Sequence, residues 1–108
     1  MHLIVFFVGD DNGSARIRID TLVAETRAAF KLAQQELDVA VVQRGETRHD
    51  AIPSFEDVGG KMHGLWGFGQ RPGFALIRPD GYVGYIGMLD DRKDFMDWMR
   101  TYPYLSNE

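Results

Sequence analysis

The stretch from Gly73 to Gly87 constrains the fold most strongly, because it contains two strand-like segments and the turn between them. Runs rich in β-branched and aromatic residues, Phe74 to Ile77 and Tyr82 to Ile86, flank the segment Arg78-Pro79-Asp80-Gly81. The proline of this segment presets φ for a turn, the aspartate can bond to its own backbone, and the glycine tolerates a positive φ. The pattern therefore predicts a β-hairpin.

The first 43 residues predict a β-α-β unit. Leu3 to Val8 is continuously apolar, which is typical of a strand covered on both faces, and Val39 to Gln43 is a second strand. Between them we expect a helix with Asp20 as its N-cap, running from Thr21 to about Glu36. Its buried stripe has helical spacing and consists of Leu22, Thr26, Ala29, Phe30, Ala33 and Leu37. Such a unit makes the two strands parallel, with a right-handed crossover.

The chain ends in a second predicted helix. It begins at Leu89-Asp90-Asp91, where acidic residues suit the positive end of the helix dipole, and it continues to about Tyr102, where Pro103 stops it. Its expected buried stripe is Phe95, Trp98, Met99 and Tyr102.

Residues Arg44 to Pro72 form the least regular stretch, with six glycines. We expect a loop, with a short helix over Ser54 to Val58 as an alternative. Its apolar side chains are too many to stand together in water, and they are Met62, Leu65, Trp66 and Phe68. The stretch either covers the sheet face that the helices leave open, which we favour, or is presented to a partner.

Composition limits the classes of function. With 108 residues and 44% apolar content, the chain suits a single globular domain over 1–108. A net charge of −4 without clustered Lys and Arg argues against binding nucleic acid or an anionic membrane. The chain has no cysteine, which excludes disulfides, thiolate metal sites and thiol chemistry. The apolar run near the N-terminus is too short for a signal peptide or a membrane span, so we expect a cytoplasmic protein.

No group of residues has the pattern of a catalytic or metal site. His2, His49 and His63 are not paired with other ligands at helical spacing, and no nucleophile motif accompanies His49-Asp50. Gly9-Asp10 follows an apolar strand, as in some flavin sites, but an acidic loop is the better interpretation because no dinucleotide-binding pattern is present. We therefore expect no catalytic residue and no metal in this chain.

The motif Arg78-Pro79-Asp80-Gly81-Tyr82-Val83 lies between two strands and is followed by an acidic stop and a final helix. In this it resembles the C-terminal thioredoxin-like domain of the FAD-dependent phenol (aromatic-ring) hydroxylases, over nearly the full length of the chain. Where that family commonly has Tyr-Gly, this chain has Trp66-Gly67. The resemblance implies an α/β thioredoxin-like fold, with β-α-β and then β-β-α around a mixed four-stranded sheet and no Cys-x-x-Cys motif. Pro72 precedes the third strand, where thioredoxin folds often carry a cis-proline.

The resemblance also implies a function. In those monooxygenases the domain carries no catalytic residue and contributes to dimerisation, while other domains of the full-length flavoprotein hold FAD. We therefore expect an interaction domain that binds no cofactor itself and that associates with itself or with a flavoprotein hydroxylase. The residues predicted to make the contacts are Trp66, Phe68, Tyr82, Tyr85 and Met96.

Two points are left open by the sequence. The alternative function is a small-molecule binding protein in which residues 62–74 form the wall of a pocket for an aromatic compound or a flavin. Arg78 has alternatives too, since it can pair with Asp80, with Asp90 or across an interface, or simply end the strand at the surface.

Overall fold

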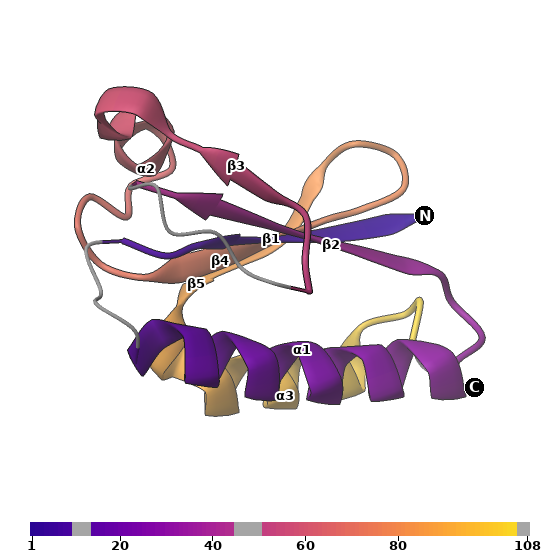
Figure 1. The fold of residues 1–108 in the computed structure, drawn as a ribbon. Coiled ribbons are helices and arrows are strands. Elements are labelled where there is room, and N and C mark those ends of the chain that lie inside the picture. The colour runs from indigo at the N-terminus through magenta and orange to yellow at the C-terminus, as the bar shows by residue number, and fades with distance from the viewer. Residues whose placement is uncertain (10–13, 45–50, 106–108) are drawn as a thin grey trace.

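The computed structural model describes residues 1–9, 14–44 and 51–105, which form one five-stranded sheet with its helices (Figure 1). The strands are β1 (His2–Phe7), β2 (Leu37–Gln43), β3 (Ser54–Glu56), β4 (Gly73–Ile77) and β5 (Val83–Met88). The helices are α1 (Ser14–Leu32), α2 (Lys61–Leu65) and α3 (Arg92–Thr101), and 3₁₀ turns occupy η1 (Val58–Gly60) and η2 (Leu89–Asp91).

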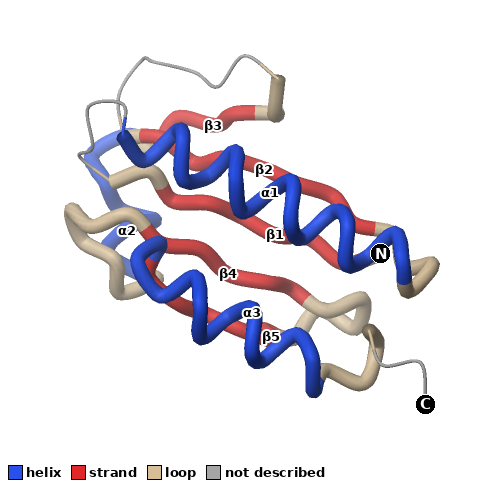
Figure 2. Tube along the Cα trace, turned by 90° about the horizontal axis from the view of Figure 1, so that it is seen from below, coloured by secondary structure: helices blue, strands red, loops and turns tan. Residues whose placement is uncertain are grey.

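The sheet has the strand order β3-β2-β1-β4-β5. β1 is central and runs parallel to β2 and antiparallel to β4, and β4 and β5 form the predicted hairpin. Helices α1 and α3 lie side by side on one face of the sheet, while α2 lies at one end of the opposite face (Figures 1 and 2). A β-α-β unit followed by β-β-α on a mixed sheet is the thioredoxin-like topology, so the predicted fold class is confirmed.

The main core lies between the sheet and helices α1 and α3. Alternate side chains of β1, Ile4 and Phe6, point into it because successive strand residues face opposite sides of the sheet. Helix α1 contributes Phe30 and helix α3 contributes Phe95, each 1% exposed or less. Burying a side chain of this size contributes about 1.5–3 kcal/mol to folding, so this layer accounts for most of the packing energy.

Helix α1 begins and ends earlier than predicted. It starts at Ser14 rather than Thr21, because Ala15 and Ile19 extend the buried stripe toward the N-terminus. It ends at Leu32 rather than near Glu36, and Leu37 belongs to β2. The end is a Schellman motif, in which Gln34 has φ 58°, its N–H bonds to Lys31 O at 3.0 Å, and Gln35 N–H bonds to Phe30 O at 2.8 Å.

The sheet has one strand more than the four predicted. The alternative of a short helix over Ser54 to Val58 is wrong, because Ser54–Glu56 pairs in parallel with the end of β2 as β3. Backbone bonds hold it there, from Val41 N–H to Pro53 O at 2.9 Å and from Asp57 N–H to Gln43 O at 2.6 Å.

The peptide bond before Pro72, whose isomer the sequence leaves open, is trans, since none of the described peptide bonds is cis. The carbonyl oxygen of Pro72 accepts the N–H of Leu89 at 3.0 Å, which ties the start of β4 to the end of β5. The final helix differs little from expectation, because η2 occupies Leu89–Asp91 and α3 ends one residue before Tyr102.

Candidate functional site

A buried carboxylate and imidazole lie where the segment after β3 meets the end of β1. Asp57 and His63 are 3% and 0% exposed, and the distance from His63 Nδ1 to Asp57 Oδ2 is 2.7 Å. The same carboxylate accepts the backbone N–H groups of Met62 and His63, both at 2.9 Å, in the first turn of α2. The other ring nitrogen, Nε2, accepts the backbone N–H of Gly9 at 3.0 Å.

These bonds define the protonation of the pair. Because Nε2 accepts a hydrogen from Gly9, Nδ1 carries the ring proton and donates it to Asp57. Burial by itself would raise the pKa of Asp57, but hydrogen bonds from the His63 side chain and from the N–H groups of Met62 and His63 outweigh it and lower the pKa to about 2. The carboxylate is therefore ionised at neutral pH.

An Asp-His pair of this kind can serve catalysis only if Nε2 is able to reach a substrate. Here Nε2 is occupied by a backbone N–H inside the protein, so the pair joins three segments of the chain instead. Gly9 is required for this contact, since a Cβ atom there would lie 2.5 Å from the carbonyl oxygen of Gln70. We call Gly9, Asp57 and His63 the histidine lock.

Several hydrogen bonds and an ion pair within the turn motif of the hairpin hold it in shape. Arg78 pairs with Asp80 at 2.5 Å, which is one of the alternatives left open by the sequence. Asp80 Oδ1 accepts Tyr82 N–H at 3.2 Å, Gly81 N–H bonds to Arg78 O at 2.9 Å, and Gly81 has φ 88°. Pro79 is exposed at the tip. These bonds within the motif therefore fix the turn.

The segments that the structure describes cover one end of the sheet face opposite α1 and α3. There, Trp66 and Phe68 pack on Phe7, with ring centroids 5.7 and 5.0 Å apart, and this confirms the favoured prediction for the irregular stretch. Toward the other end, the register of the strands places a group of half-buried or exposed apolar side chains on this face, and none of the helices in residues 1–9, 14–44 and 51–105 lies over them. We call this group the open sheet face, and it consists of Leu3, Val5, Ala40, Ile77, Val83 and Ile86.

The five predicted contact residues lie in three separate places. Trp66 and Phe68 belong to the small cluster around Phe7, and Phe68 is only 4% exposed, so as folded it has almost no surface for a partner. Tyr85 and Met96 pack against the main core on the helix side. Tyr82 alone is largely exposed, at 70%, beside the open sheet face.

Val83 and Ile86 are not among the contact residues predicted from the sequence, and the histidine lock was not predicted either. Alternation along the second hairpin strand puts Ile86 on one face, but only the order of strands and helices shows that this face is open. Three loop residues considered in the sequence, Asp10, His49 and Asp50, lie outside the described residues.

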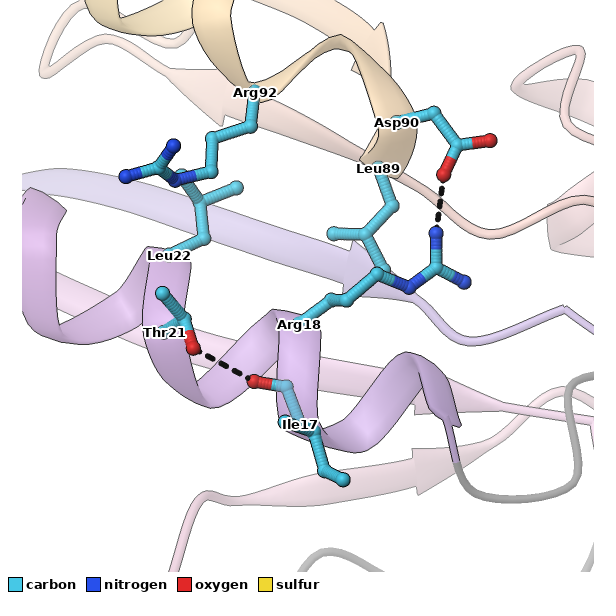
Figure 3. Close-up of a pocket in the computed structure, with 7 residues that line it drawn as sticks. All are labelled: Ile17, Arg18, Thr21, Leu22, Leu89, Asp90 and Arg92. Carbon is cyan, nitrogen blue, oxygen red and sulfur yellow. Dashed lines mark hydrogen bonds and ion pairs between the residues drawn. The ribbon is translucent and has the colours of Figure 1, made fainter.

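A pocket of about 390 Å³ lies between α1 and the beginning of α3 (Figure 3). Leu22 and Leu89 form apolar parts of its lining, and Arg18 and Arg92 extend along it. Both guanidinium groups are already paired, Arg18 with Asp90 and Arg92 with Glu25, so an anionic ligand would have to displace a carboxylate. The aromatic residues of the 62–74 stretch are not part of its lining.

Neither a metal site nor a membrane span is found in the part of the chain that the structure describes. Within residues 1–9, 14–44 and 51–105, no three His, Asp or Glu side chains gather as metal ligands. No helix in these ranges is both long and apolar enough to cross a bilayer.

The topology described above is that of a thioredoxin-like domain, and the chain has no cysteine. No protein-family model and no curated protein matches the chain. Among solved structures, it is similar to the pneumococcal exposed lipoprotein thioredoxin Etrx1 of Streptococcus pneumoniae strain TIGR4, with 13% identity, a TM-score of 0.44, and 90% of this chain and 84% of that chain covered. It is also similar to the N-terminal domain of PilB from Neisseria gonorrhoeae, with 16% identity, a TM-score of 0.43, and 86% and 76% covered.

Proposed function

We propose that the chain is a non-catalytic interaction domain that associates with a second copy of itself or with a flavoprotein aromatic-ring hydroxylase. The observation that carries the proposal is the open sheet face. A sheet in a layered α/β fold normally buries both faces, and here no helix of the described residues covers an apolar area that spans β2, β1, β4 and β5. Val83 and Ile86 in this area are each 48% exposed.

The resemblance of the hairpin and last helix to the hydroxylase C-terminal domain supports the same proposal. In such an assembly FAD would be held by the hydroxylase, and this domain would contribute contact surface only. The expected cytoplasmic location remains a prediction, which fractionation of the source cells would test.

The proposal is tested by substituting an exposed valine on the open sheet face. In Val83→Lys the ammonium group would have to be desolvated at the contact, so association should weaken by about tenfold or more. The matched control is Val58→Lys, since Val58 is 76% exposed and lies in η1 away from this face. Light scattering coupled to size exclusion, over roughly a hundredfold range of concentration, measures self-association. Binding of the chain to a purified phenol hydroxylase that lacks its C-terminal domain measures association with a hydroxylase.

Equal behaviour of Val83→Lys and Val58→Lys in both assays would contradict the proposed surface. Failure of the wild-type chain to associate in either assay would contradict the function itself.

A further inference from the structure

The imidazole of His2, at the start of β1, is a buried titratable group that the proposed function does not use. The residue is 0% exposed, and its Nε2 atom lies 2.8 Å from the hydroxyl oxygen of Tyr102. Its Nδ1 atom is also buried and has no hydrogen-bond partner among the described residues. An imidazolium would carry a proton on both ring nitrogens, so it would leave an N–H on Nδ1 without an acceptor. The site therefore suits neutral His2.

Three aromatic rings enclose the His2 side chain. They belong to Phe30 of α1 and to Tyr102 and Tyr104, which follow α3, and each meets the imidazole edge to face. Their centroids lie 5.0, 5.6 and 4.8 Å from that of the imidazole, in the same order. The two tyrosines are the titratable residues among these neighbours, and burial raises the pKa of the Tyr102 hydroxyl, which keeps it neutral near pH 7. Apolar surroundings of this kind penalise the charged form of a histidine.

The charged groups near His2 add to this penalty. Burial is the largest cause of the lowered His2 pKa, and the positive charges of the Met1 ammonium group and of Arg78 lower it further. The carboxylate of Asp80 acts in the opposite direction but is paired with Arg78. A lowered histidine pKa contributes stability that is complete above the ordinary value of 6.5 and is lost progressively as pH falls below that value.

Among the elements around this imidazole, residues 102–105 are held least firmly. Strand β1 is bonded to β2 on one side and to β4 on the other, and Phe30 lies within α1. The backbone bonds described for residues 102–105 are local, from Tyr102 N–H to Met99 O at 3.3 Å and from Leu105 N–H to Tyr102 O at 2.9 Å. Neither bond reaches the sheet, so the described contacts of this segment with β1 are made by side chains. Segments held in this way open at the lowest cost in free energy.

We propose that residues 102–105 act as an acid-released flap, which protonation of His2 detaches from the start of β1. This inference is separate from the proposed function and does not involve the open sheet face. The proton comes from solvent and binds to the ring nitrogen that is unprotonated in the neutral imidazole. Release of the flap lets both N–H groups reach water, which removes the penalty of the enclosed imidazolium.

Release of the flap also uncovers aromatic surface. Tyr102 is 6% exposed while the flap is closed, and it stacks on Trp98 with ring centroids 4.5 Å apart. Its departure exposes one face of the Trp98 ring together with the His2 imidazole. The flap therefore hides this surface at neutral pH and makes it accessible as the pH falls.

Hydrogen exchange measured by NMR tests the proposal, because it detects openings that are rarely populated. The exchange rates of the Tyr102 and Leu105 amides are measured at about pH 7.5 and about pH 5.5, and each is compared with the intrinsic rate at the same pH. Release takes up one proton, so the protection of both amides should fall by up to about tenfold for each pH unit below 6.5. The amide of Ile4, inside β1, is the control for opening of the whole domain.

His2→Gln is the decisive variant, because glutamine is polar but does not titrate in this range. The protection of the Tyr102 and Leu105 amides should then be nearly the same at both pH values. The proposal is overturned if the variant loses protection as the wild type does, if the wild type shows no loss, or if the Ile4 amide loses protection equally.

A pair of tyrosine variants tests the flap even if His2→Gln does not fold. Tyr102→Phe removes the hydroxyl bonded to His2 but keeps the ring, so the protection of the Leu105 amide should fall about threefold to tenfold at about pH 7.5. Tyr104→Phe is the matched control, because the contacts described for Tyr104 are made by its ring. Equal protection of the Leu105 amide in both variants would mean that the bond from His2 to Tyr102 does not hold the flap, and would overturn the proposal.

Discussion

At the scale of single residues, the histidine lock is the feature with the clearest energetic consequence. The pKa of Asp57 is about 2 in the folded protein against 3.8 ordinarily, so folding favours its ionised form. A depressed carboxyl pKa adds stability that is complete above the ordinary value and is lost as pH falls through 3.8 toward 2. At 1.36 kcal/mol for each pKa unit, this shift corresponds to about 2.5 kcal/mol at most.

We predict that Asp57→Asn destabilises the protein by about 2–4 kcal/mol at pH 7, because the amide cannot accept from two backbone N–H groups and the imidazole as the carboxylate does. Urea unfolding between pH 7 and pH 2.5 measures the effect. The difference in unfolding free energy between wild type and variant should narrow over the lower part of this range, because Asp57 takes up a proton in the unfolded wild-type chain below pH 3.8 while it stays largely ionised in the folded one. Asp97→Asn, at an exposed position on α3, is the matched control. If the difference in unfolding free energy between wild type and Asp57→Asn stayed constant with pH, that result would contradict an ionised Asp57 in the folded protein.

At the scale of elements, the end of α1 contains a residue in an energetically unfavourable backbone conformation. Gln34 is exposed and takes a left-handed conformation that costs a residue with a Cβ atom about 1–2 kcal/mol. We predict that Gln34→Gly stabilises the protein by about 0.5–1 kcal/mol, since glycine reaches this conformation without steric cost, although its unfolded chain is more flexible.

Gln35→Gly provides the comparison for Gln34→Gly, because Gln35 lies next to it and is not among the residues with a positive φ. Thermal unfolding of both variants should show a higher midpoint for the first and a lower one for the second. If both variants were less stable than the wild type, the left-handed conformation of Gln34 would not be what lowers the stability of the protein at this position.

The elements also show which parts of the fold can be predicted from the sequence. The hairpin was predicted because proline, aspartate and glycine determine its turn locally, and the structure retains all of their bonds within the turn. The end of α1 was missed because the usual signal at a left-handed cap is glycine or asparagine, and here it is Gln34. The edge strand β3 was missed because three residues carry too little alternation to distinguish a strand from a turn.

At the scale of the whole molecule, the proposed function depends on the sheet face that the described helices leave uncovered. Alternation within β1 predicts that Val5 and Phe6 face opposite sides, but only the complete arrangement shows that Phe6 is under a helix and Val5 is beside an open face. The predicted contact residues were selected for aromatic character, and the fold uses Phe68 and Tyr85 in packing. Val83 and Ile86 are therefore identified as candidate contact residues by their exposure and by the strand order, and not by their residue type.

The histidine lock also has a consequence for kinetics. The bond from Gly9 to His63 joins positions 54 residues apart, whereas the turn of the hairpin closes over a few residues. Contacts between distant positions carry the larger chain-closure cost, so we expect the hairpin to form before the main folding barrier and the lock to close after it. An interaction made after the barrier slows escape from the native state without speeding arrival. The histidine lock would then set the rate at which the folded protein unfolds, while the hairpin would set the rate at which the chain folds.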